Sequence, residues 1–140
     1  MITIVDYGLG NPASIVNMLA HIGIESRISA DPDDIASASH LILPGVGAFD
    51  RGMQELQSRD LIQHLNRAVI DNKTPALGIC LGAQLLLDSS EEGSEKGLGW
   101  ISGQVVKFDL TDYPDLKIPH MGWNKIYPKR PTHLLDGLDD

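Results

Sequence analysis

Several features that would place a chain in a special class of protein are scarce in this sequence. Its 140 residues include a single cysteine, which cannot form an internal disulfide and fits a reducing compartment. No apolar run approaches the roughly 20 residues that span a bilayer. The N-terminus also lacks the basic and then apolar pattern of a secretory signal. These absences predict a cytoplasmic protein with no membrane partner.

Basic residues are scarce as well. Eleven Lys and Arg residues stand against nineteen Asp and Glu residues, and the formal net charge is −8. This balance lacks the basic footprint of a nucleic-acid-binding protein, so we expect no nucleic-acid partner. Small molecules and other proteins remain as partners. The length and the apolar content of 42% are typical of one ordinary globular domain.

Short apolar runs alternate with amphipathic runs over the first ninety residues. They predict strands at residues 2–5, 24–29, 41–43 and 75–79, and helices that begin at residues 12, 31, 60 and 81. This alternation indicates an α/β protein with a doubly wound, mostly parallel sheet and helices on both faces. Asp60 is expected to cap its helix. Further strands are expected at residues 101–108 and around Ile118 and Ile126.

Gly-rich turns follow three of the predicted strands, at the sheet edge where ligands of such folds bind. The first turn, residues 8–13, matches a relaxed dinucleotide-binding fingerprint. The acidic residue that the fingerprint requires is absent, because the second strand ends in Ile28 and Ser29. The five histidines are scattered, with no pair at ligand spacing. We therefore predict no cofactor and no metal site.

The strongest local signal is the run Gly78-Ile79-Cys80-Leu81-Gly82 between a predicted strand and a predicted helix. It is the cysteine form of a nucleophile elbow, in which flanking glycines permit a sharp turn that exposes the nucleophile. The helix N-terminus favours the thiolate, and the Leu81 amide is placed to bind a developing oxyanion. The alternative is a buried structural cysteine.

A second signal is the run Pro44-Gly45-Val46-Gly47-Ala48-Phe49 after the third strand. Its glycines allow the backbone to approach a ligand and to aim amides at it. Beside an elbow, such a loop can supply a second oxyanion donor. The alternative is an ordinary tight turn between a strand and a helix.

Together these motifs resemble the class I glutamine amidotransferases, and most closely their glutaminase subunits of imidazole glycerol phosphate synthase, from histidine biosynthesis. The resemblance covers nearly the whole chain. It rests on residues 6–11, 44–49, 78–84, 89–93, 97–99 and 117–124, which occur in the family's order. It implies a flavodoxin-like fold and a heterodimer with a (β/α)8-barrel cyclase, to which ammonia from glutamine is delivered.

The resemblance also implies roles for single residues. Cys80 is the nucleophile that attacks the glutamine amide and forms a thioester. Val46 and Gly47, with Leu81, form the oxyanion hole. Gly45 and Gln84 hold the glutamine. The expected interface with the barrel subunit comprises Asn11, Pro119, His120, Met121, Gly122, Trp123 and Asn124.

The sequence departs from the family at several positions. Pro12, Ala83 and Trp100 replace residues of other types and suggest a paralogous subunit for surface-sugar (lipopolysaccharide) synthesis. No His-x-Glu pair follows the Trp-Asn motif, although the family uses such a pair as general base. We therefore expect residues 1–140 to be the N-terminal, nucleophile-bearing part of the domain, truncated before its last strands, with an exposed sheet edge.

Two further alternatives stay open at this stage. The first is an inactive fragment that only binds its partner. The second is a different elbow-cysteine enzyme of similar fold, such as a peptidase-like or glyoxalase-like protein. The latter requires its own base near Cys80 and has no need of residues 119–124. An amidotransferase is expected to be labelled at Cys80 by glutamine-like electrophiles. Co-purification with a cyclase subunit without glutaminase activity is expected of the fragment.

Overall fold

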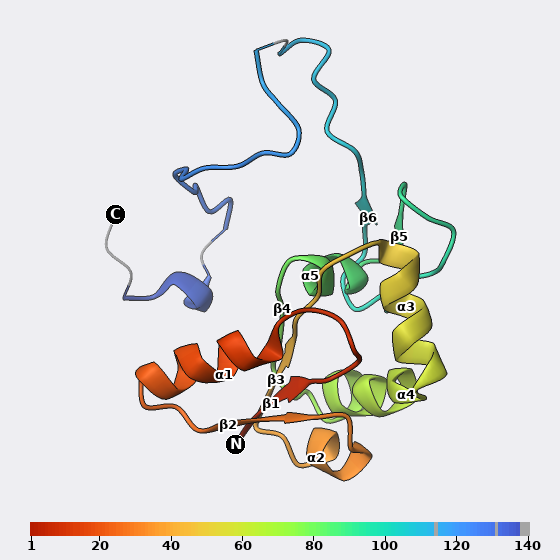
Figure 1. Ribbon diagram of the computed structural model, residues 1–140, viewed down its shortest axis with the longest axis vertical. Helices are drawn as coiled ribbons and strands as arrows, with labels where there is room; N and C mark the ends of the chain where they lie inside the picture. The colour runs from red at the N-terminus through yellow and green to blue at the C-terminus, as the bar shows by residue number, and fades with distance from the viewer. Residues whose placement is uncertain (114, 131, 138–140) are drawn as a thin grey trace. The chain divides into compact units, whose positions relative to one another are not determined.

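The computed structural model describes residues 1–113, 115–130 and 132–137 (Figure 1). Residues 114, 131 and 138–140 of the expected domain 1–140 lie outside the described residues. The chain divides into two compact units, Met1–Lys107 and Phe108–Asp140, which we describe separately.

The first unit contains a parallel sheet and the helices that cover it. The strands of this sheet are β1 (Ile2–Val5), β2 (Ser26–Ser29), β3 (His40–Leu43) and β4 (Ala76–Gly78). The helices are α1 (Pro12–His21), α2 (Pro32–Ala36), α3 (Phe49–Ser58), α4 (Leu61–Asn66) and α5 (Leu81–Leu85), and a π-helical turn η1 (Arg67–Asp71) extends α4. Two short parallel strands, β5 (Ser89–Ser90) and β6 (Gln104–Val105), pair separately.

The strand order in the main sheet is β2-β1-β3-β4, and every pairing is parallel. The register places Ile4 beside Ile28 on one side and beside Ile42 on the other. Because all strands run the same way, the segments that follow β1, β3 and β4 meet at one edge of the sheet. This arrangement confirms the α/β class with a parallel sheet.

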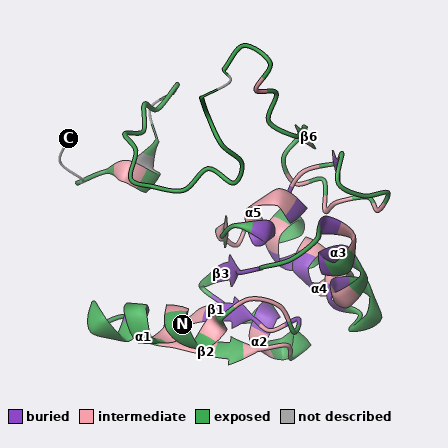
Figure 2. Ribbon diagram, turned by 45° about the horizontal axis from the view of Figure 1, so that its top comes forward, coloured by how far each residue is buried: buried purple, intermediate pink, exposed green. Residues whose placement is uncertain are grey.

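Alternate residues of the strands enter two separate cores, one on each face of the sheet. Ile4 and Ile42 pack with Leu19 of α1 on one face. Val5 and Leu43 belong to the larger core on the other face. That core is completed by Ile35 of α2, Phe49 and Leu56 of α3, Leu61 and Leu65 of α4, and Leu81 and Leu85 of α5. Figure 2 shows this buried material concentrated in β1, β3 and helices α3 to α5. The expectation of helices on both faces is therefore confirmed.

Three local predictions for this unit differ from the structure. Strand β2 begins at Ser26 rather than at residue 24, because the Ile24 amide donates to the Leu19 carbonyl at the end of α1 (2.9 Å). Asp60 precedes α4 as expected but does not cap it; its backbone is left-handed (φ 57°) and its carboxylate accepts from Gln63. Of residues 101–108, only Gln104–Val105 form a strand.

The second unit, as described over residues 108–113, 115–130 and 132–137, has a short 3₁₀ turn, η2 (His133–Leu135), as its one regular element. Ile118 and Ile126 were expected in short strands, and both lie in exposed irregular backbone. Because the described residues of this unit form no strand, Ile118 and Ile126 have no sheet to join there. No helix among the described residues is long and apolar enough to cross a membrane.

Candidate active site

Cys80 lies at the turn between β4 and α5, where it is a free and exposed thiol. Its backbone has φ 55° and ψ −120°, a conformation that L-residues rarely adopt. This strain is the signature of a nucleophile elbow, since the turn projects the side chain away from the sheet edge. The structure therefore reproduces the backbone geometry that the sequence predicted for this segment.

The two glycines around Cys80 are required by packing rather than by their own backbone angles. A Cβ atom on Gly82 would lie 1.8 Å from the carbonyl oxygen of Leu43, at the end of β3. A Cβ atom on Gly78 would lie 2.5 Å from the Cα of Ala83 in α5. Both contacts are far inside van der Waals distance and involve backbone. The close approach of α5 to β3 and β4 thus depends on these two positions.

The loop at residues 44–48 runs beside the elbow and is joined to it by a hydrogen bond. The Leu81 amide donates to the carbonyl oxygen of Gly45 at 3.3 Å. Val46 and Gly47 are exposed, and Gly47 has a φ of 112° that glycine tolerates best. Because a trans peptide holds its C=O and N–H in opposite directions, the Val46 amide points away from Leu81. The residues expected to form the oxyanion hole are therefore adjacent, and one of their donors is already bonded.

The two residues expected to hold glutamine also lie at this edge. Gly45 is buried next to the start of α5, where its missing Cβ would lie 3.0 Å from the amide nitrogen of Gly82. Gln84 is four residues after Cys80 and partly buried. Its backbone N–H donates to the Cys80 carbonyl oxygen (3.3 Å). Gln84 thus lies in the first turns of α5, directly after the strained residue.

Tyr7 lies fully buried beneath these two segments. Its hydroxyl donates to the Pro44 carbonyl at 2.5 Å. Burial, and to a smaller extent the negative charge of Cys80, raise the pKa of Tyr7 to about 12. The phenol is therefore neutral and able to donate at any pH near neutrality. Motif reasoning missed Tyr7, although a polar aromatic residue immediately beyond a buried strand is a signal for such a role.

Two carboxylates tie the segment after β5 to the start of α3. The Phe49 amide, at the first residue of α3, donates to Glu92 (3.1 Å). In the other direction, Asp50 accepts from the amides of Ser94 (3.0 Å) and Glu95 (2.9 Å). These amide bonds, Ser94 first, lower the pKa of Asp50. The loop at residues 44–48 is thereby anchored at its far end.

Comparison with known proteins agrees with this geometry. The sequence profile of the family "Glutamine amidotransferase class-I" matches residues 3–140. The chain belongs to the class-I glutamine amidotransferases. It is 53% identical over 138 residues to "Imidazole glycerol phosphate synthase subunit HisH 2" of Methanococcus maripaludis, with 99% of this chain and 67% of that protein covered.

Two further relatives of this amidotransferase carry related names. "Imidazole glycerol phosphate synthase subunit HisH 2" of Pseudomonas aeruginosa is 46% identical over 140 residues, which are 100% of this chain and 68% of that protein. "Imidazole glycerol phosphate synthase subunit HisH" of Sulfurimonas denitrificans is 48% identical over 142 residues, again 68% of its length. The chain thus spans about two thirds of the length of these curated relatives.

A solved structure supports the amidotransferase fold. The "Crystal structure of glutamine amidotransferase" superposes with a TM-score of 0.63 over 76% of this chain and 56% of that chain. At 19% sequence identity this similarity concerns the fold alone. The fold class expected from the alternation of strands and helices is confirmed by this match.

The residues expected at the interface of the amidotransferase with its partner divide between the two units. Asn11 is exposed and caps α1, since its side-chain oxygen accepts from the Ser14 amide (3.3 Å). It therefore has a local structural role in addition to the expected one. Residues 119–124 are all exposed in the second unit, with Trp123 completely open to solvent. Their role as an interface stays a prediction.

Among the histidines of the first unit, which are His21, His40 and His64, none lies at the turns that surround Cys80. His40 begins β3 and so lies at the opposite edge of the sheet from Pro44. His21 ends α1, and His64 is partly buried on α4. Among the described residues, no group of three His, Cys, Asp or Glu side chains could hold a metal ion. In the described part of the first unit, the exposed Cys80 thiol thus has no histidine beside it.

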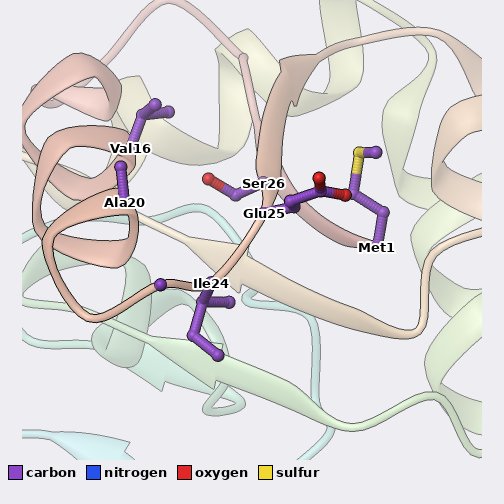
Figure 3. Close-up of a pocket in the computed structure, with 7 residues that line it drawn as sticks. Met1, Val16, Ala20, Ile24, Glu25 and Ser26 are labelled. Carbon is purple, nitrogen blue, oxygen red and sulfur yellow. The ribbon is translucent and has the colours of Figure 1, made fainter.

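A hollow of about 500 Å³ lies away from these turns, between α1 and β2 (Figure 3). Met1, Val16, Ala20, Gly23, Ile24, Glu25 and Ser26 line it. The buried Ser26 hydroxyl is the one buried side-chain polar atom without a hydrogen-bond partner in the described part of the chain. None of the predicted site residues borders this hollow.

Proposed function

We propose that this chain supplies the nucleophile and the oxyanion donors of the glutaminase subunit of imidazole glycerol phosphate synthase. Its substrate is glutamine, and its products are glutamate and ammonia. Residues 1–140 are, in this proposal, the nucleophile-bearing part of the amidotransferase domain. The strained and exposed Cys80 at the β4–α5 turn is the observation that carries it, and the names of the relatives support the assignment.

The proposed reaction proceeds through a thioester. The Cys80 thiolate adds to the side-chain amide carbon of glutamine, and the amide oxygen becomes an oxyanion. Collapse of this intermediate breaks the C–N bond, and the nitrogen leaves as ammonia after taking up a proton. Water then adds to the thioester carbon, and glutamate leaves as the thiolate is regenerated. The intermediate is short-lived unless hydrogen-bond donors face its oxygen.

Backbone amides of the elbow and of the neighbouring loop are the proposed donors. The Leu81 amide must first give up its bond to the Gly45 carbonyl, which at 3.3 Å is a long hydrogen bond. A turn of the Gly45–Val46 peptide would free Leu81 and bring the Val46 amide towards the thiol. The glycine at position 45 and the positive φ of Gly47 make such a turn sterically inexpensive.

The thiol becomes a nucleophile when a base removes its proton. This sequence has no His-x-Glu pair to supply that base. Removing the base of a nucleophilic cysteine lowers turnover by orders of magnitude. The nucleophile can be tested separately from turnover, because thiolates form without a base at about pH 9. A cytoplasmic location belongs to this proposal, since the reaction needs Cys80 in its reduced form.

The proposed partner is a (β/α)8-barrel cyclase subunit that receives the ammonia. Support comes from the second unit, where Met121 is 84% exposed and Trp123 is fully exposed. Large apolar side chains of this kind are unfavourable in water and are typical anchors of protein interfaces. In the first unit, Asn11, exposed at the start of α1, is separately proposed to contact the barrel subunit.

The test of this proposal is labelling of Cys80 at about pH 9 by a glutamine-shaped chloroketone, followed by intact mass. Because Cys80 is the only cysteine, its loss in Cys80→Ala must abolish labelling and serves as the assignment control. The decisive result is protection. Glutamine at about ten times its dissociation constant should slow labelling roughly tenfold, and asparagine at the same concentration should not.

Equal labelling rates with and without glutamine would contradict the proposed substrate. In that event, co-purification with a barrel cyclase subunit would indicate that the chain is a fragment that binds its partner but not glutamine. Labelling of denatured protein provides the reference, because a thiol in an unfolded chain has no reason to prefer a glutamine-shaped reagent.

The second candidate is a paralogous subunit for surface-sugar synthesis, suggested by Pro12, Ala83 and Trp100. The structure gives two of these residues local roles: Pro12 is the first residue of α1, and Trp100 donates to Asn66 at 2.7 Å. Such roles are independent of the ammonia acceptor, so we favour the histidine pathway on the relatives' names. Assays of ammonia transfer with the barrel subunit of each pathway distinguish the two.

A further inference from the structure

Tyr7 is the only side chain whose hydroxyl reaches the start of the proposed oxyanion loop in the described residues. It follows β1 by two residues and is fully buried, and its hydroxyl donates to the Pro44 carbonyl. The two residues are 37 positions apart in sequence. Since Pro44 directly follows β3, this bond joins the ends of two neighbouring strands at the sheet edge that carries Cys80.

The hydroxyl also determines how closely Gly45 can approach the elbow. A Cβ atom on Gly45 would lie 2.4 Å from the Tyr7 oxygen and 3.0 Å from the Gly82 amide nitrogen. The backbone of Gly45 is therefore held between the phenol on one side and the start of α5 on the other. Any other residue at position 45 would displace one of them.

The first two carbonyls of the loop are thus bound by different groups. The Pro44 carbonyl accepts from the buried Tyr7 hydroxyl, and the Gly45 carbonyl accepts from the Leu81 amide. The amides of Val46 and Leu81 can both donate to an oxyanion only if the bond between the Leu81 amide and the Gly45 carbonyl opens. The first bond does not oppose that change, and it keeps the preceding peptide in place while the Gly45–Val46 peptide turns.

We propose that Tyr7 is a positioning residue of the glutaminase site, whose hydroxyl fixes the Pro44 carbonyl so that the loop presents its amides to the oxyanion formed at Cys80. This inference rests on the proposed function. The phenol remains protonated throughout the range in which a thiolate reacts, because burial raises the pKa of Tyr7 to about 12. Tyr7 therefore donates to Pro44 at every step.

Two reagents with different transition states test this role. Addition of the thiolate to the carbonyl of a glutamine-shaped chloroketone creates an alkoxide before chloride leaves and the C–S bond is final. Iodoacetamide is attacked at its CH₂ carbon, with direct loss of iodide and no alkoxide. The ratio of the two maximal labelling rates at Cys80 therefore reports on oxyanion stabilisation. A change in thiol exposure alters both rates alike, and loss of the glutamine site raises the chloroketone concentration for half-maximal rate.

Tyr7→Phe removes the hydroxyl and keeps the ring, and Tyr113→Phe is the matched control at an exposed tyrosine. We expect the rate ratio to fall about tenfold in Tyr7→Phe, less than the loss of a direct oxyanion donor. It should stay within twofold of the unchanged chain in Tyr113→Phe. For the chloroketone, the maximal rate should fall while the concentration for half-maximal rate is unchanged, since Tyr7 does not contact glutamine in this proposal.

A donor-preserving replacement completes the test. With 4-aminophenylalanine at position 7, an amine donates from the place of the hydroxyl, and the ratio should return to within about threefold of that of tyrosine. This comparison also decides the question if Tyr7→Phe does not fold. An unchanged ratio in folded Tyr7→Phe, or a ratio lowered as strongly by the amine, would overturn the inference while glutamine protection left the proposed function standing. Absence of glutamine protection in the unchanged chain would overturn both.

Discussion

At the scale of single residues, the site depends on positions that carry no side chain. Gly78 and Gly82 have ordinary backbone angles, and each is required because another backbone occupies the place of its Cβ. Cys80 between them carries the strained conformation, which exposes the thiol. The elbow is thus produced by one strained residue and two close contacts, and its geometry follows from steric exclusion.

Substitution of Gly82 tests this dependence. We expect Gly82→Ala to lower the free energy of unfolding by about 3 kcal/mol or more, or to prevent folding, because its methyl group would overlap the Leu43 carbonyl. Gly52→Ala is the matched control, since its Cβ would meet movable side-chain methyl groups and no backbone: those of Leu85 at 3.0 Å and one of Leu81 at 3.3 Å. Its effect should stay within about 1 kcal/mol. Urea unfolding of both variants measures the difference, and equal costs would contradict the steric explanation.

At the scale of elements, hydrogen bonds in both directions join the start of α3 to the segment after β5. Helix α3 begins without a capping side chain of its own at Ala48, and the Glu92 carboxylate accepts from its first amide instead. In the other direction, the Asp50 carboxylate accepts from the backbone amides of Ser94 and Glu95. These bonds fix the far end of the loop whose near end Tyr7 holds.

The charge of Asp50 makes this attachment sensitive to acid. Amide donors hold the pKa of Asp50 below its ordinary value of 3.8, so its ionised form is favoured in the folded state. A group of this kind stabilises the fold above its unfolded pKa, and the contribution is lost as the pH falls through the lower folded value. Asp50→Asn should therefore unfold at lower urea than the unchanged chain at pH 6, and the gap should shrink as the pH falls below 3.8.

Asp71→Asn provides the control for this experiment, because Asp71 is exposed at the end of η1. Its urea midpoint at pH 6 should match that of the unchanged chain. A gap for Asp50→Asn that persisted undiminished into acid would show that the carboxylate's charge is not what stabilises the contact.

At the scale of the whole molecule, the two units differ in how their chains are held. Residues 1–107 share a sheet with a core on each face. The described residues from 108 onward are mostly exposed, and their backbone hydrogen bonds join residues only three apart, as from Tyr113 to Leu110. Local bonds of this kind open independently of a core.

Limited digestion with trypsin should reveal this difference. We expect the first cuts after Lys117, Lys125 and Lys129, which lie in exposed irregular backbone. Arg27, paired with Asp34, and Arg59, paired with Glu55, should be cut much more slowly. Mass spectrometry of early time points identifies the order. Cleavage after Arg27 as fast as after Lys117 would contradict the assignment of the stable core to the first unit.

Sequence patterns predicted the elements whose signals are local. The strand at residues 2–5, the helix from Pro12 and the elbow at Cys80 all occur, because apolar spacing, a proline at a helix start and paired glycines act over a few residues. Helix α3 was missed, although Phe49, Met53 and Leu56 have helical spacing. Its first amide is satisfied by Glu92, more than forty residues away, so no capping signal precedes it.

The sequence by itself determined the class of fold, the position of the strained turn at Cys80 and the glycines that this turn requires. Only the tertiary structure decided which groups those turns would contact. Three sets of hydrogen bonds join segments that become neighbours when parallel strands align. They run from Tyr7 to Pro44, from Leu81 to Gly45, and from the amides of residues 94–95 to Asp50. Periodicity and turn chemistry act on adjacent residues, whereas hydrogen bonds between chain segments are chosen by packing of the whole sheet and its helices.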